Sequence, residues 1–67
     1  MWIVWNKNNL INANAFISIG LSGSVIYLRE SGEAKPLELS FEDEDRAKRA
    51  YNYLLEGMRG KAPMVHL

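Results

Sequence analysis

The sequence contains no cysteine, and His66 is the single histidine among its 67 residues. Disulfide bonds therefore cannot stabilise the fold. A structural zinc site is not expected either, because such sites need several Cys or His ligands. A chain this short buries only about 60% of the surface that its unfolded form exposes. Tight packing or association with a second copy must supply the remaining stability.

The sequence also lacks an excess of charge of either sign. It has 8 Lys plus Arg and 8 Asp plus Glu, which gives a formal net charge of zero. A balanced charge removes the usual electrostatic reason to expect a nucleic acid or an anionic membrane as partner. The apolar content of 48% is too high for a disordered chain. We therefore expect one small folded domain over 1–60, followed by a short tail over 61–67.

Long hydrophobic runs are missing as well. The longest mostly apolar stretch, 13–21, contains Asn14, Ser18 and Gly20. It is about half the length that a membrane-spanning helix needs. The apolar start, 1–5, is short and carries no basic residue, unlike a signal peptide. We expect a soluble, cytoplasmic protein with no membrane partner.

The first two thirds of the sequence are typical of β-strands. Trp, Ile and Val are dense near the start, and apolar residues then recur at every second position. One face of the second strand should carry Ala15, Ile17, Ile19 and Leu21. A Ser22-Gly23 turn predicts a hairpin, and Ser31-Gly32-Glu33 predicts a second turn. The expected strands cover 2–6, 15–21, 24–30 and 37–41.

A helix is predicted after the last strand. It begins either with a capping box formed by Ser40 and Asp43 or with Asp43 as the N-cap. Gly57 or Gly60 ends it, and Gly60 suits the position just past the last turn. The apolar stripe of this helix consists of Ala47, Ala50, Tyr51, Leu54 and Met58. The tail beyond it either frays or adds a short strand over 64–66.

These patterns predict an α+β fold in which an antiparallel β-meander of three or four strands packs against one C-terminal α-helix. No residue set predicts catalysis, a cofactor or a metal, so we do not expect an enzyme. The acidic run 42–45 suits the positive end of the helix dipole. His66 lies in the tail and is interpreted as a surface residue. The glycines near Ser22 lie between strands and lack the Lys of a phosphate-binding loop.

Aromatic side chains are the most suggestive group. Exposed aromatic residues anchor protein–protein interfaces or stack on single-stranded bases. The predicted sheet offers few cations to hold a phosphate backbone, and acids offset them, so packing or interface roles are favoured. The candidate interface residues are Trp2, Trp5, Phe16, Tyr27, Tyr51 and Tyr53.

Over 2–58 the pattern resembles a loose class of short uncharacterised bacterial and phage-type proteins with several strands followed by one helix. The resemblance rests on Trp2-Ile3, Ile11-Asn12, Leu37-x-Leu39-x-Phe41 with the acids after it, and Ala47 with Ala50. A weaker similarity is to transcriptional coactivators that bind single-stranded DNA, which share a curved four-stranded sheet and dimerise through helices. Their basic strands and loops are not matched here. Neither similarity transfers a functional residue.

The functional hypothesis is a non-enzymatic domain that acts through self-association. One helix covers one sheet face, which leaves apolar side chains of the front half to be covered by something else. A symmetric homodimer is the commonest closed arrangement. An unidentified protein partner is also considered, and the alternative hypothesis is a single-stranded nucleic-acid-binding protein.

Overall fold

The computed structural model describes residues 1–32 and 35–67. It confirms the α+β class. The elements along the chain are β1 (Trp2–Trp5), β2 (Asn9–Asn12), the 3₁₀ turn η1 (Ala13–Ala15), β3 (Phe16–Ser22), β4 (Val25–Glu30), β5 (Leu37–Ser40), α1 (Glu44–Arg59) and β6 (Met64–His66). The turn predicted over 31–33 falls partly outside the described residues, because it includes Glu33.

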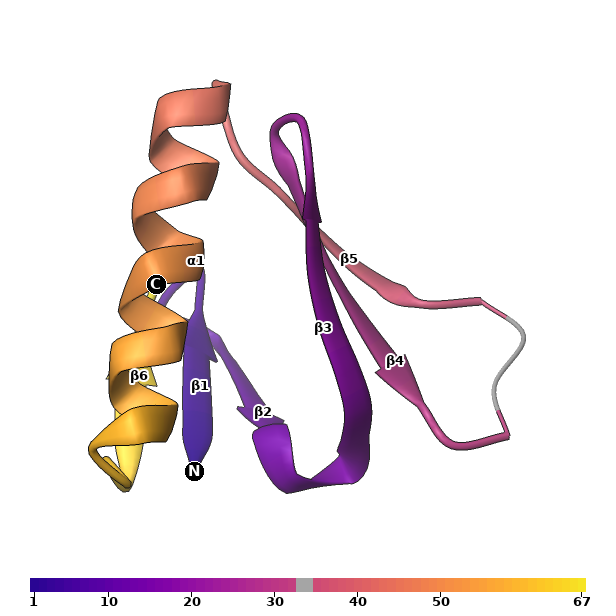
Figure 1. The fold of residues 1–67 in the computed structure, drawn as a ribbon, viewed down its shortest axis with the longest axis vertical. Coiled ribbons are helices and arrows are strands. Elements are labelled where there is room, and N and C mark those ends of the chain that lie inside the picture. The colour runs from indigo at the N-terminus through magenta and orange to yellow at the C-terminus, as the bar shows by residue number, and fades with distance from the viewer. Residues whose placement is uncertain (33–34) are drawn as a thin grey trace.

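The strands divide into two sheets where one meander was expected. The first sheet has the order β2-β1-β6 and the second has the order β3-β4-β5. Neighbours are antiparallel except for β1 and β6, which are parallel. Figure 1 shows α1 beside β1 and β6 on the left and the second sheet on the right. The chain leaves the first sheet at η1, builds the second sheet and the helix, and returns with β6.

The tail is part of the first sheet, in agreement with the second of the two alternatives considered for it. β6 places Met64 beside Trp2 and Val65 beside Ile3. The Leu67 N–H donates a hydrogen bond to the Val4 carbonyl at 2.9 Å, which extends the pairing to the last residue. Val65 is 3% exposed. The first and last segments of the chain therefore hold each other in place.

A β-bulge changes the predicted face of β3. The pairing with β4 shifts register between Phe16 and Ser18. A bulge inserts one extra residue and so reverses the alternation on one side of it. Phe16 consequently packs against the core, whereas Ile17 is 68% exposed. The prediction that Ile17 shares a buried face with Ile19 is therefore wrong, although Ile19 itself does pack on the core.

The helix begins as one of the two capping alternatives predicts. Asp43 is the N-cap, and its side chain accepts a hydrogen bond from the Arg46 N–H at 2.8 Å. Ala47 and Leu54 are fully buried, as their place in the apolar stripe predicts. Met58, the last member of that stripe, is 40% exposed. Gly57, and not Met58, packs against β6, because only a residue without a side chain fits there.

The end of α1 differs by one residue from the expected arrangement. Gly60 is the C-cap with φ −83°, and Lys61 adopts the left-handed conformation with φ 54°. The Lys61 N–H bonds the Met58 carbonyl at 3.2 Å, and the Ala62 N–H bonds the Gly57 carbonyl at 2.8 Å. This pair of bonds is a Schellman motif, which usually places glycine where Lys61 lies. It turns the chain back toward β6.

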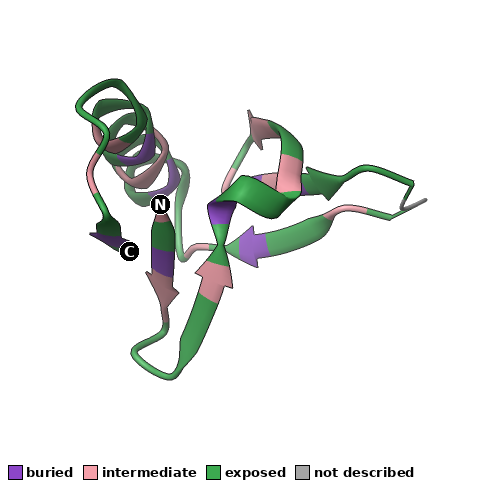
Figure 2. Cartoon of the chain, turned by 90° about the horizontal axis from the view of Figure 1, so that it is seen from below, coloured by how far each residue is buried: buried purple, intermediate pink, exposed green. Residues whose placement is uncertain are grey.

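One hydrophobic core joins the two sheets and the helix. Its fully buried side chains come from β1, β4, β5 and α1, and they are Ile3, Ile26, Leu28, Leu39 and Leu54. Figure 2 shows buried segments on the strands, on the helix and at the start of η1, where Ala13 is buried. Both sheets thus turn one face inward, and each keeps an outer face of its own.

Candidate functional site

A cleft lies between α1 and the C-terminal end of the first sheet. Its volume is about 740 Å³. This size is within the range of about 300–1,000 Å³ that small-molecule sites occupy. Residues from β1, β6, the segment before α1 and the helix itself line it: Trp5, Asn6, Ser40, Phe41, Glu42, Arg46, Arg49, Ala50, Asn52, Tyr53, Glu56, His66 and Leu67.

Two aromatic rings form the apolar part of the cleft. The Trp5 and Phe41 ring centroids are 5.0 Å apart with an interplanar angle of 65°, which is an edge-to-face contact. Both residues are half-buried and pack against the core. Leu67 joins them from the last position of the chain, where its backbone is held by Val4. The apolar surface is therefore fixed by packing and by the first sheet.

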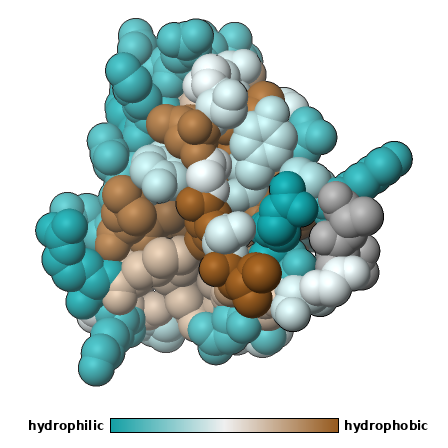
Figure 3. Space-filling view, turned by 45° about the vertical axis from the view of Figure 1, so that its right-hand side comes forward, coloured by the Kyte–Doolittle hydropathy of each residue, from teal (hydrophilic) through white to brown (hydrophobic). Residues whose placement is uncertain are grey.

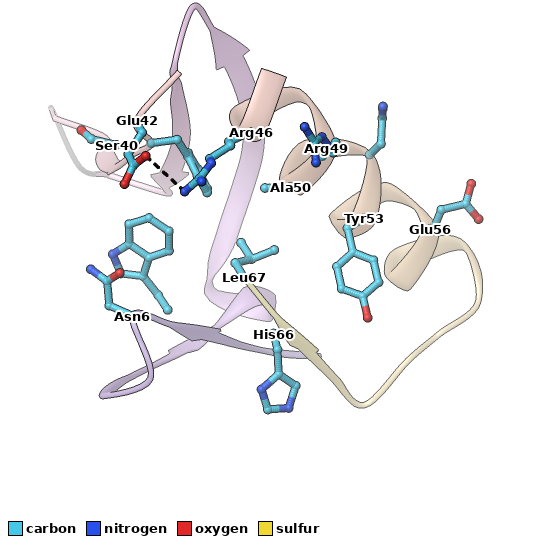
Figure 4. A pocket seen from close by; sticks show the side chains of 13 residues that line it. Asn6, Ser40, Glu42, Arg46, Arg49, Ala50, Tyr53, Glu56, His66 and Leu67 are labelled. Carbon is cyan, nitrogen blue, oxygen red and sulfur yellow. Dashed lines mark ion pairs between the residues drawn. The ribbon is translucent and has the colours of Figure 1, made fainter. Parts of the chain in front are cut away.

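One face of α1 supplies the polar wall. Each of these residues has another of them three or four positions away, so they share one side of the helix: Arg46, Arg49, Ala50, Asn52, Tyr53 and Glu56. The Arg46 guanidinium pairs with Glu42 at 3.3 Å and approaches Asp43 at 4.0 Å. Arg49 forms no ion pair within residues 1–32 and 35–67. Figure 4 shows Arg46 bound to Glu42 on one side and the Tyr53 ring on the other, with the His66 ring pointing away.

The outer face of the first sheet is a second candidate surface. Trp2 and Val4 alternate with the buried Ile3 and therefore lie on the outer side. Their partners across the ladder share that side. The outer face of the first sheet accordingly consists of Trp2, Val4, Leu10, Asn12, Met64 and His66. Trp2 is 42% exposed, Leu10 58% and Met64 45%.

This outer face carries no Lys, Arg, Asp or Glu at any of its six positions. Other apolar side chains also reach the surface, among them Ile17 and Leu37 of the second sheet. On the side of the molecule that Figure 3 shows, apolar side chains gather in the middle and hydrophilic ones surround them. The outer face of the first sheet differs in being uncharged across three adjacent strands.

The six predicted interface residues lie on several surfaces. Trp2 is on the outer face of the first sheet, and Trp5 and Tyr53 line the cleft. Phe16 and Tyr51 are half-buried and pack against the core. Tyr27 is half-buried and lies on the outer side of the second sheet, between the inward Ile26 and Leu28. The structure therefore brings Trp5 and Tyr53 to one site and separates the others.

Sequence reasoning missed Arg49, Leu67 and Met64 as site residues. A signal was present for the first, since Arg46, Arg49 and Tyr53 follow the helical period on a face next to the apolar stripe. No local signal marks Leu67 or Met64, because their positions depend on the parallel pairing of β6 with β1. That pairing joins opposite ends of the chain.

In residues 1–32 and 35–67, no three His, Asp or Glu side chains are grouped so that they could hold a metal ion. Within the same residues, no helix has the length and apolar character needed to cross a membrane. No family model matches the sequence, and no curated protein or solved structure shows a significant similarity to it.

Proposed function

We propose that the protein is a non-enzymatic domain of the cytoplasm that acts through self-association, with the outer face of the first sheet as the dimer interface. The observation that carries this proposal is the row of exposed Met64, Trp2 and Leu10 on adjacent strands. Apolar area that is removed from water on association contributes about 25 cal/mol per Å². Met64 lies opposite Trp2, and Leu10 lies opposite Val4, the next residue of β1 on the same side, so one partner surface can cover all three exposed side chains.

A second copy of the chain is the partner that best fits this face. In a two-fold symmetric interface the same patch of both copies meets, so a patch with charges of one sign would repel its own copy. The outer face of the first sheet has no formally charged side chain, and self-contact therefore meets no such repulsion. Two sheet faces pack at a separation of about 10 Å, which side chains the size of Trp and Leu fill.

Single-stranded nucleic acid remains the alternative hypothesis, and the arrangement of the aromatic residues favours it less. Base stacking along a strand needs several aromatic rings on one basic surface. Trp2, Phe16 and Tyr27 lie on different surfaces. The outer face of the first sheet carries no Lys or Arg at its six positions. Oligonucleotide binding with a steep salt dependence would favour the alternative.

The experiment compares two charge-introducing variants at exposed aliphatic positions. Leu10→Lys places a cation on the outer face of the first sheet, and Ile17→Lys places one at the bulge of the second sheet. Both positions are exposed, at 58% and 68%, so both variants should fold. We expect Leu10→Lys to weaken dimerisation by more than about tenfold, and Ile17→Lys to leave it unchanged. Equal dimerisation of the two variants would place the interface elsewhere.

A further inference from the structure

The cleft is independent of the proposed dimer interface, because only His66 belongs to both surfaces. We propose that this cleft is a binding site for a small aromatic monocarboxylate. The observation that points to this ligand is that one cleft is lined both by the aromatic floor, Trp5 and Phe41, and by Arg49, which has no carboxylate partner in the described residues. The volume, the floor, the cation and the charge balance each restrict the ligand.

The aromatic floor of the cleft, Trp5 and Phe41, favours a ligand with a planar apolar group. Trp5 and Phe41 already meet edge to face at 5.0 Å, and Leu67 continues their apolar surface. A third ring placed on this pair can add offset-stacked or edge-to-face contacts of the same kind. Tyr53 stands on the helix side of the cleft and is 56% exposed. A ligand that covers it would remove much of this ring from water.

The Arg49 guanidinium favours a ligand with a negatively charged group. The neighbouring Arg46 is held by Glu42 at 3.3 Å, so its guanidinium already has a carboxylate partner. Arg49 lies one helical turn further along the same side of α1 and has no such partner in the part of the chain that the structure describes. A guanidinium binds a carboxylate through two parallel hydrogen bonds, which fixes the orientation of the bound group.

The balance of charge in the cleft favours a monoanion over a phosphate. The lining contains two guanidinium groups, on Arg46 and Arg49, and two side-chain carboxylates, on Glu42 and Glu56. A ligand with one negative charge can pair with Arg49 alone. A phosphate monoester carries up to two charges near neutral pH, and in the described lining its second charge would find no unpaired guanidinium, because Arg46 already pairs with Glu42.

The test uses 1-naphthoate as the probe and the fluorescence of Trp5 as the readout. A Trp2→Phe background leaves Trp5 as the only tryptophan, so that the signal reports the cleft. The matched probes are 1-naphthalenemethanol, which lacks the charge, acetate, which lacks the ring, and 1-naphthyl phosphate, which carries a dianion. We expect saturable binding of naphthoate, with a clearly lower affinity for each of the other three.

Variants at two cationic residues of α1 test the role of Arg49. Arg49→Gln should weaken naphthoate binding by about tenfold or more, because a charge-assisted contact is lost. Lys48→Gln is the control, since Lys48 is exposed, does not line the cleft and forms no ion pair in the part of the chain that the structure describes. Both side chains are on the surface, so both variants should keep the fold, which circular dichroism checks.

Four results would overturn the proposal. They are the absence of saturable naphthoate binding at millimolar concentration, equal affinity for the alcohol, tighter binding of the naphthyl phosphate, and equal loss of affinity in Arg49→Gln and Lys48→Gln. None of these results bears on the dimer, because dimerisation is measured without the probe and with variants outside the cleft.

Discussion

Gly57 of α1 and Val65 of β6 approach each other so closely that a Cβ atom on residue 57 would lie 2.5 Å from Val65 Cγ2. The same atom would lie 3.3 Å from Met1 Sδ. Val65 is buried and β-branched, so its side chain has little freedom to move away. The absence of a side chain at residue 57 is what lets the helix pack on the strand formed by the tail.

Replacing Gly57 with Ala should therefore destabilise the protein. In an exposed helix the same change stabilises by about 1 kcal/mol. Here we expect the free energy of unfolding to fall by about 1–3 kcal/mol, because the new methyl group overpacks the contact. Urea denaturation measures it, with Asn52→Ala on the exposed side of the helix as a control that should be neutral or slightly stabilising. A Gly57→Ala protein more stable than the wild type would contradict the contact.

A double-mutant cycle separates this contact from other effects of the substitution. Val65→Ala alone should lower the free energy of unfolding, since a buried side chain is shortened. In the Val65→Ala background, however, Gly57→Ala should cost less than it does in the wild type, because the obstructing Cγ2 atom is gone. Additive effects of the two substitutions would show that the residues do not interact.

Lys61, which is left-handed at the end of α1, is a position where a glycine should make the protein more stable. Lys61 has φ 54°, a conformation that costs a non-glycine residue about 1 kcal/mol. Lys61→Gly should therefore raise the free energy of unfolding by about 0.5–1 kcal/mol, after a small loss of favourable charge at the helix end. Lys48→Gly, inside the helix, should lower it by about 1 kcal/mol. Thermal unfolding of the two variants shows whether the changes have opposite signs.

The N-cap predicts a difference between two substitutions of Asp43. Its carboxylate accepts the Arg46 N–H at 2.8 Å. Asp43→Ala should lower the free energy of unfolding by about 1 kcal/mol, whereas Asp43→Asn should have a much smaller effect, because Asn caps helices about as well as Asp. If the two variants lost the same stability, the charge would matter and the hydrogen bond would not.

The bulge in β3 predicts that two neighbouring isoleucines respond differently. Ile17 is 68% exposed, so Ile17→Ala should change the free energy of unfolding by less than about 0.5 kcal/mol. Ile19 packs against the core, so Ile19→Ala should cost about 2 kcal/mol or more. Chemical denaturation of both variants tests the register. Equal losses would fit the simple alternation that the sequence predicts.

Local signals account for what the sequence predicted correctly. The strands β4 and β5 and the helix are marked by alternation, by the helical period and by Asp43, all of which act between near neighbours. The bulge at Phe16 and Ser18 has no comparable mark, so Ile17 was assigned to the wrong face. The sequence did not predict that Gly60 is the C-cap and that Lys61 is the left-handed residue after it, because glycine is the usual residue in the left-handed position.

The division into two sheets depends on contacts between distant parts of the chain. β6 pairs with β1 across nearly the whole length of the sequence, and no periodicity within either segment reveals this pairing. The cleft could not be predicted for the same reason, since Trp5, Arg49 and Leu67 come from β1, the helix and the last position. The aromatic residues were sound candidates as a class, and the structure shows which of them share a site.

Self-association is tested most directly by sedimentation of the wild-type chain over a range of micromolar concentrations. The chain has a mass of 7.6 kDa. A reversible dimer through the outer face of the first sheet predicts that the mass approaches twice this value as the concentration rises, and that Leu10→Lys shifts the transition to higher concentration. A mass that stays at 7.6 kDa throughout would contradict the proposed function.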